Sequence, residues 1–163
     1  MRIAVNFLLF QAGWFACVAG PAWLGPVAVA LVVAVDLAWS RHRTHELKTV
    51  VATGALGSLS DLLLVQAGLL VFRGGGYPLW MAALWLNFGT VLNVSLKWLR
   101  GRWWLAAALG AVAGPLVYLG GERLGATEVQ PGTLIAVAVQ FGIGVPGLLW
   151  LARRLGERRC SSS

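Results

Sequence analysis

The sequence predicts an all-α polytopic membrane protein with six transmembrane helices and with both termini in the cytoplasm. Apolar residues make up 58% of the 163 residues, and charged residues only 12%, against about 25% in soluble domains. The apolar residues gather in six long runs, and most of the basic residues gather at alternate ends of these runs. A soluble protein of this length cannot bury so much apolar surface, so the soluble classes are excluded.

Each apolar run is about 18–24 residues long, which at about 1.5 Å per residue spans a hydrocarbon core about 30 Å thick. The runs cover residues 3–20, 22–40, 49–72, 79–99, 103–120 and 133–152. We therefore expect a single six-helix transmembrane domain over residues 1–152. A basic cytoplasmic tail over residues 153–163 follows it.

Polar or helix-breaking residues separate the first three runs. Pro21 ends the first run, and Trp23 and Trp39 lie at the two ends of the second, where amphipathic rings favour the membrane interface. The third run follows the most polar segment of the chain, residues 41–48, and is ended by the sequence RGGGYP at residues 73–78.

The last three runs are bounded in the same way. Basic residues follow the fourth run at Arg100 and Arg102. The fifth run contains the pair Gly114-Pro115, which predicts a kink. A polar loop over residues 121–132 separates it from the sixth run.

The distribution of basic residues predicts the orientation. Eleven of the 13 Lys and Arg residues lie on one predicted side of the membrane, and only Arg73 and Arg123 lie on the other. The eleven are Arg2, Arg41, Arg43, Lys48, Lys97, Arg100, Arg102, Arg153, Arg154, Arg158 and Arg159. Because Lys and Arg accumulate in cytoplasmic loops, both termini are expected in the cytoplasm.

Several classes of site are not expected. The basic residues flank apolar runs instead of forming a patch, and no nucleic-acid-binding motif occurs, so we expect no nucleic acid partner. His42 and His45 lack further metal ligands nearby, so we expect no metal site. No nucleotide-binding, metalloprotease or hydrolase motif occurs, and we expect no cofactor.

Asp61 is the most informative residue, because it lies in the middle of an apolar run. A carboxylate at such a position costs about 2.5–3.5 kcal/mol on insertion scales and indicates a functional site by default. Thr53 and Gly57 precede it at intervals of four, and Gly54 and Ser58 lie one residue round the helix. This small, polar stripe is expected to face other helices and not lipid. With no Lys or Arg at its estimated depth, we expect Asp61 to be a neutral acid.

Three amides are predicted to lie at a similar level in the membrane. The helix rise places Asp61 about 16 Å, Asn87 about 13 Å and Gln140 about 11 Å from the outer face, with Gln11 near the middle of its span. Amides of this kind also serve simply to hold helices together. Asn6, Asn93 and Asp36 form a candidate second level nearer the cytoplasm, where Asp36 is expected to pair with the basic loop at residues 41–48. The candidate ligand-binding set is Asp61, Asn87, Gln140, Gln11, Trp85, Asn93 and Tyr118.

Three segments resemble a small bacterial inner-membrane family known as domain of unknown function 2878. They are NFLLFQAGWFACV at residues 6–18, GAVAGPLVY at residues 110–118 with its continuation to LGA at 124–126, and the central pairs LW at 84–85, LN at 92–93 and SL at 95–96. The resemblance covers nearly the whole chain, although Val94 stands where the family often has His. It implies a multi-span inner-membrane protein without an established activity. It also implies an association with enzymes that modify membrane fatty acids.

Three functional hypotheses follow. The first is a membrane protein that binds or positions a lipid-like molecule in a pocket around Asp61, with membrane lipids and lipid-modifying enzymes as partners. The second is a small proton-coupled transporter that uses Asp61, which at this length requires a homo-oligomer. The third is a scaffold without a ligand. An enzyme is less expected, because it needs a second catalytic group, and only amides, Tyr118 and Glu122 are within reach of Asp61.

Overall fold

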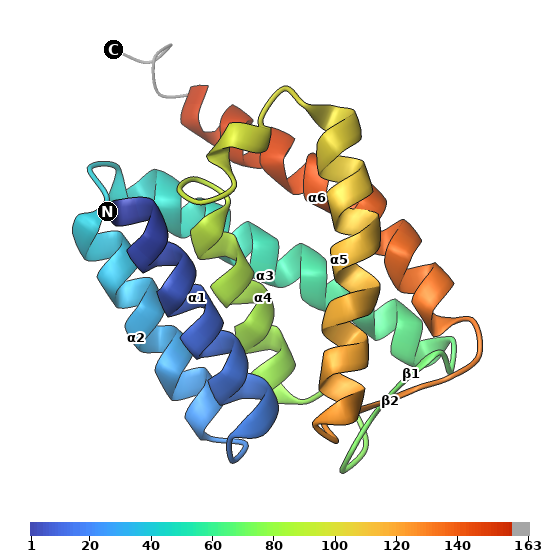
Figure 1. Cartoon of the computed structure of the whole chain (residues 1–163). Helices are drawn as coiled ribbons and strands as arrows, with labels where there is room; N and C mark the ends of the chain where they lie inside the picture. Colours follow the sequence, from blue (N-terminus) through green and yellow to red (C-terminus); the bar gives the residue numbers. More distant parts are fainter. Residues whose placement is uncertain (158–163) are drawn as a thin grey trace.

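The computed structural model describes residues 1–157, and most of this part of the chain is helical (Figure 1). Backbone polar groups inside a membrane must bond within the chain, and helices satisfy this need locally. The α-helices are α1 (Arg2–Ala19), α2 (Leu24–Trp39), α3 (Arg43–Gln66), α4 (Leu79–Val91), α5 (Trp103–Arg123) and α6 (Thr133–Glu157). Two short strands, β1 (Leu70–Phe72) and β2 (Thr127–Val129), and a 3₁₀ helix, η1 (Lys97–Leu99), complete the order. The all-α prediction is confirmed.

The helices form two groups that α3 and α6 join. Helices α1, α2 and α4 lie side by side, and α3 packs along α4 behind them. Helix α6 crosses α3, and α5 packs mainly on α6. In Figure 1, α5 therefore stands apart from α1 and α4.

Four helices are long and apolar enough to cross a membrane: α1, α3, α5 and α6. Helices α2 and α4 are apolar but shorter, with 16 and 13 residues. The structure therefore supports a membrane protein with at least these four candidate spans. Helix α5 runs without interruption through Pro115.

The third predicted run differs from the structure at both ends. Helix α3 begins at Arg43, inside the polar segment, where Glu46 lies in its first turn and stabilises the positive end of the helix dipole. It ends at Gln66, because Gly68 adopts a positive φ of 70° and the amides of Gly68 and Leu69 bond back to the carbonyls of Val65 and Leu64. The remaining apolar residues of the run, Leu70–Phe72, form β1 instead of helix.

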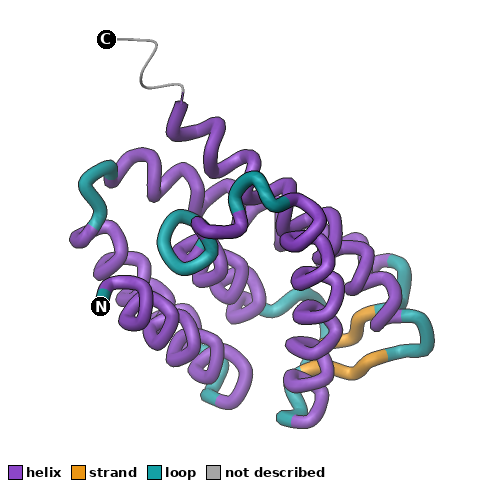
Figure 2. The backbone as a smooth tube through the Cα atoms, turned by 45° about the horizontal axis from the view of Figure 1, so that its top comes forward, coloured by secondary structure: helices purple, strands orange, loops and turns teal. Residues whose placement is uncertain are grey.

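Helix α5 ends in the same kind of cap. Gly125 has a φ of 76°, and the amides of Gly125 and Ala126 bond back to the carbonyls of Glu122 and Gly121. The chain then enters β2, which pairs with β1 in a two-stranded antiparallel sheet with Val71 opposite Glu128. Figure 2 shows these strands at the end of the molecule remote from the N-terminus. The predicted polar loop at residues 121–132 therefore contains a helix end and a strand.

The fourth predicted run is also not one helix. Helix α4 ends at Val91, and an irregular turn leads to η1. Non-helical backbone at membrane depth is tolerated where protein covers it, and Leu92 and Leu99 in this segment are 0% and 2% exposed. The Arg100 side chain donates hydrogen bonds to the carbonyl of Leu92 and to the Asn93 side chain. These bonds give partners to two of the polar groups in this non-helical segment.

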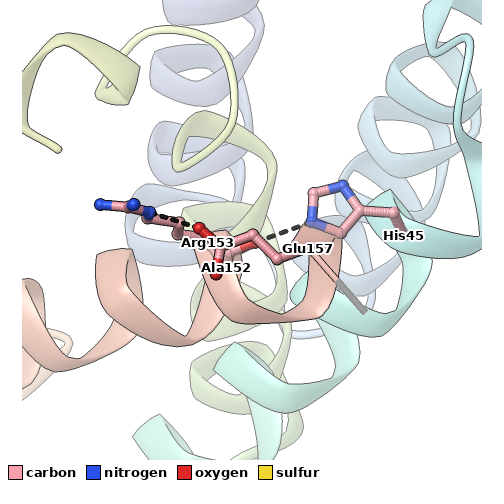
Figure 3. A network of polar contacts seen from close by, with 4 residues as sticks. All are labelled: His45, Ala152, Arg153 and Glu157. Carbon is pink, nitrogen blue, oxygen red and sulfur yellow. Dashed lines mark hydrogen bonds and ion pairs between the residues drawn. The ribbon is translucent and has the colours of Figure 1, made fainter. Parts of the chain in front are cut away.

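Most basic residues lie at one end of the molecule. The start of α1, the α2–α3 turn, η1 and the C-terminal end of α6 meet there, whereas the strands lie at the other end. At the basic end, His45 Nε2 donates to the carbonyl of Ala152 over 2.7 Å and ties α3 to α6 (Figure 3). On the same turn of α6, Arg153 bonds to Glu157 at 2.6 Å and lowers the pKa of that carboxyl. Residues 153–157 of the predicted tail are thus helical, and residues 158–163 lie outside the described residues.

Candidate functional site

The Asp61 carboxyl group is the centre of a hydrogen-bonded cluster in which three helices each supply a donor. Trp85 Nε1 of α4 donates to Asp61 Oδ2 at 2.6 Å. Tyr118 Oη of α5 and Gln140 Nε2 of α6 both donate to Asp61 Oδ1, each at 2.7 Å. Asp61 itself is 0% exposed. Four helices therefore converge on one carboxyl group, which faces protein and not lipid.

The small residues of α3 allow this convergence. Thr53, Gly54 and Gly57 are buried on the same face as Asp61, as the sequence stripe predicts. The Trp85 ring lies directly against Gly57, and a side chain there would overlap the ring. The prediction that this face of the helix points inward is confirmed.

No basic side chain neutralises Asp61 in the described part of the chain. Its side-chain partners are an indole, a phenol and an amide, and the ion pair found within residues 1–157 joins Arg153 to Glu157. The cluster is therefore bound by hydrogen bonds from neutral donors. Trp85 and Tyr118 direct their only polar side-chain atoms at Asp61, so the remainder of both rings is free to form apolar surface.

Two further residues belong to this cluster although the sequence argument did not select them. Gln140 Nε2, which donates to Asp61, also donates to Ser60 Oγ at 2.6 Å. The Ser60 hydroxyl in turn donates to the carbonyl of Gly57. The centroid of the Phe141 ring lies 5.2 Å from that of the Trp85 ring. It lies 6.2 Å from the centroid of the Tyr118 ring, and these two rings meet edge to face. Each is next in sequence to a selected residue, Asp61 or Gln140, and that adjacency is the signal that could have identified them.

An apolar groove adjoins the cluster between α5 on one side and α1 and α4 on the other. Its cavity has a volume of about 240 Å³ and an almost wholly apolar wall. Trp85, Tyr118 and Phe141 form part of its inner wall, and Phe7 and Trp98, which are about half exposed, lie at its edge. Other lining residues include Phe10, Trp14, Leu84, Phe88, Leu96, Ala113, Val117 and Val145. Asp61 does not line the groove; it holds two of the wall residues in place.

A second cavity of about 250 Å³ lies on the other side of Trp85 and Phe141, between α3 and α6. Ser60 and Gln140 contribute polar groups to its lining, together with several glycines. The two cavities share a wall made of Trp85, Phe141 and Val145.

The remaining predicted site residues do not join Asp61. Asn87 is 0% exposed and donates to the carbonyl of Phe10 at 2.9 Å, and its amide lies directly against Gly13 of α1. Gln11 is half-buried on α1, outside the hydrogen-bonded cluster found within residues 1–157. Asn93 binds Arg100 in the irregular turn after α4. Asp61, Asn87 and Gln140 are predicted at similar depths in the membrane, but the three side chains do not meet. A similar depth does not determine the direction in which each side chain points around its helix axis.

A separate polar cluster lies near the basic end. Ser95 Oγ donates to Asn6 Oδ1 at 2.6 Å, and Asn6 Nδ2 donates to the carbonyl of Thr90 at 3.2 Å, which ties α1 to the end of α4. Asp36 is only 5% exposed and lies beside the buried Glu46. Within residues 1–157 it forms no ion pair with the basic loop. The expected interfacial ion pair of Asp36 is therefore not formed.

Within residues 1–157, the other candidate catalytic or metal-binding residues of the sequence form no hydrogen bond with Asp61. Glu122, considered as a second catalytic group, accepts a hydrogen bond from the Val129 amide at 3.0 Å beside the strands. Among residues 1–157, no three His, Cys, Asp or Glu side chains lie close enough to hold a metal ion. Cys17 is a free, buried thiol on α1.

Comparison with known proteins gives a family and no activity. No curated protein and no solved structure matches the chain. The model of one family, described as protein of unknown function (DUF2878), matches residues 3–146. Because this match covers most of the chain and agrees with the resemblance seen in the sequence, the protein belongs to the DUF2878 family.

Proposed function

We propose that this protein crosses a bacterial inner membrane six times, with both termini in the cytoplasm, and holds an acyl chain of a membrane lipid in the groove between α5 and α1/α4. Four helices have the length and hydropathy of membrane spans, and α2 and α4 are apolar along their lengths. The basic residues cluster at one end of the molecule, which supports a cytoplasmic position for that end.

The groove is the observation that carries the lipid proposal. Ligand sites are concave and mostly apolar, with few polar groups, and this cavity of about 240 Å³ offers almost no polar surface. Its edge residues Phe7 and Trp98 are 49% and 53% exposed, on a surface that faces hydrocarbon in the proposed orientation. A hydrocarbon chain fits this lining, because no polar ligand atom finds a partner there.

In this proposal Asp61 has a positioning role. Its three hydrogen bonds fix Trp85 and Tyr118 in the inner wall, so the groove keeps its shape whether or not a chain is bound. A proton-coupled transporter requires that Asp61 exchange protons with water on each side in turn. The full burial of Asp61 favours the positioning role over that alternative.

A matched pair of α5 variants tests the groove. Ala113 and Ala108 are both exposed on α5, but only Ala113 lines the groove. Native mass spectrometry of the purified full chain, released from detergent, measures the amount of palmitic acid that it binds. This amount should fall at least tenfold in Ala113→Phe and stay unchanged in Ala108→Phe. Equal palmitate retention by the wild type and both variants contradicts the proposed groove.

The proposed role of the protein in assisting membrane-lipid modification is tested in the cell. The protein is proposed to present bound chains to lipid-modifying enzymes in the same membrane. A strain that lacks the protein should then show an altered fatty-acid profile under envelope or oxidative stress. A strain that carries Ala113→Phe should show the same change, and a profile that stays unchanged in both strains contradicts this role.

A further inference from the structure

The acyl-chain groove has basic residues beside one of its ends. Among residues 1–157, the charged residues within two sequence positions of a groove-lining residue are Lys97 and Arg100, which lie in and directly after η1. Lys97 is exposed, and its two neighbours in sequence, Leu96 and Trp98, both line the groove. The η1 end of the groove therefore differs in charge from the end near the strands.

Two further basic residues lie beside the same end. The amide of Arg102 donates to the carbonyl of Leu99, a lining residue, at 2.9 Å, so the chain before α5 packs against this end of the groove. Ser95 also lines the groove, and its Oγ donates to the carbonyl of Ile3 at 3.2 Å, which brings the start of α1 and Arg2 to this end. Arg2 and Arg102 are both exposed. Exposed cations from two separate segments therefore lie at the η1 end.

These exposed cations form no ion pair within residues 1–157, where the ion pair found joins Arg153 to Glu157. The Arg100 guanidinium differs from them, because it donates to Leu92 and Asn93 in the irregular turn and so faces protein. Lys and Arg side chains at a membrane surface attract anionic lipids. A negatively charged group is therefore the ligand chemistry that complements the η1 end, as hydrocarbon complements the wall of the groove.

The aromatic residues around this end match the level of lipid headgroups. Trp98, Trp103 and Trp104 are all exposed here, and indole rings favour the interface between hydrocarbon and headgroups. In the proposed orientation this end faces the cytoplasm, so the groove opens beside the headgroups of the cytoplasmic leaflet. A chain in the groove can then remain attached to a headgroup that lies outside it.

We propose that the acyl chain in the groove belongs to an anionic phospholipid of the cytoplasmic leaflet, whose headgroup phosphate binds Lys97 and Arg102. This inference rests on the proposed function, because it requires that the groove hold an acyl chain. It adds the class of the lipid and the direction in which the chain enters. A zwitterionic phospholipid with the same chains fits the apolar wall equally well but has no net charge for the two cations.

The test compares two lipids that differ only in the headgroup. The purified full chain is incubated in detergent with equal amounts of dioleoyl phosphatidylglycerol and dioleoyl phosphatidylethanolamine, and native mass spectrometry measures how much of each it retains. Retention of phosphatidylglycerol should exceed that of phosphatidylethanolamine by between about fivefold and 25-fold, since each basic residue contributes about fivefold. Equal retention of the two lipids overturns this inference and leaves the groove in place. Retention of neither lipid overturns the proposed function and this inference with it.

Substitutions at one position locate the headgroup. Lys97 is exposed and its side chain forms no hydrogen bond within residues 1–157, so Lys97→Gln removes charge without removing a contact of the fold. The preference for phosphatidylglycerol should fall about fivefold in Lys97→Gln, with phosphatidylethanolamine retention unchanged, and should persist in Lys97→Arg. Arg123→Gln is the matched control, because Arg123 is an exposed cation at the strand end of α5, and its preference should equal that of the wild type.

The Ala113→Phe variant ties the headgroup to the groove. Both lipids should be lost together in this variant, since Ala113 lines the wall that their chains share. A preference that survives unchanged in Lys97→Gln overturns the assignment of the headgroup. So does an undiminished retention of phosphatidylglycerol in Ala113→Phe, which is the result expected if the lipid binds the basic surface without entering the groove.

Discussion

Replacing Asp61 by Leu removes the acceptor that four helices share. The change leaves Trp85 Nε1, Tyr118 Oη and Gln140 Nε2 without their partner. Hydrogen bonds between membrane helices contribute about 0.6 kcal/mol on average and about 1.7 kcal/mol at most. Three such bonds give an expected loss of about 2 kcal/mol in the free energy of unfolding, with an upper bound of about 5 kcal/mol.

The replacement of Asp61 by Asn gives a graded comparison. The amide keeps one oxygen, which can still accept from Tyr118 and Gln140, but it presents an NH₂ group to one of the three donors. We therefore expect Asp61→Asn to lose about one bond, or about 0.6–1.7 kcal/mol. Unfolding in mixed detergent micelles, followed by circular dichroism, measures both losses.

Leu59→Ala is the control, because Leu59 lies on the same helix and is 56% exposed towards the surface. Its effect on unfolding should be small. If Asp61→Leu is as stable as Leu59→Ala, or if it is more stable than Asp61→Asn, the cluster does not hold the helices together and the reasoning is wrong. A Trp85→Phe substitution combined with Asp61→Leu should show a cost smaller than the two single costs added, because both remove the same hydrogen bond.

Three further predictions concern other contacts. Gly57→Ala should destabilise the protein by about 1–3 kcal/mol, because its methyl group overlaps the Trp85 ring, whereas Gly144→Ala should have no such cost in the same unfolding assay. Asn6→Leu removes two hydrogen bonds between α1 and the end of α4 and should cost about 1 kcal/mol, and an unchanged midpoint would show that the pair contributes nothing. Arg100→Met should speed hydrogen exchange of the backbone amides at residues 92–96 without a similar change in α6, because the guanidinium caps this irregular turn.

The sequence is sufficient to predict the helical class and the inward face of α3. Composition and the run lengths give the former, and the spacing of Thr53, Gly57 and Asp61 gives the latter. The ends of the helices are harder to predict, because an apolar run has the same hydropathy whether it is helix or strand. Gly68 was the available signal for the end of α3, since a Gly after a helix often adopts the positive φ seen here.

The composition of the cluster could be predicted only in part. The helix rise predicts Gln140 at roughly the depth of Asp61, and the two are hydrogen-bonded. The helix rise predicts a similar depth for Asn87, but this side chain faces α1, because its position around α4 directs it towards Gly13. The break after Val91 could not be predicted, because residues 92–100 contain neither Gly nor Pro, and the turn depends on Arg100 and on burial.

A structure determined in lipid nanodiscs tests the central claim most directly. We expect Trp85, Tyr118 and Gln140 to surround an inward-facing Asp61, with continuous chain-shaped density in the groove between α5 and α1/α4. A carboxyl group turned towards the lipid, or a groove closed by α5 against α1, contradicts the account.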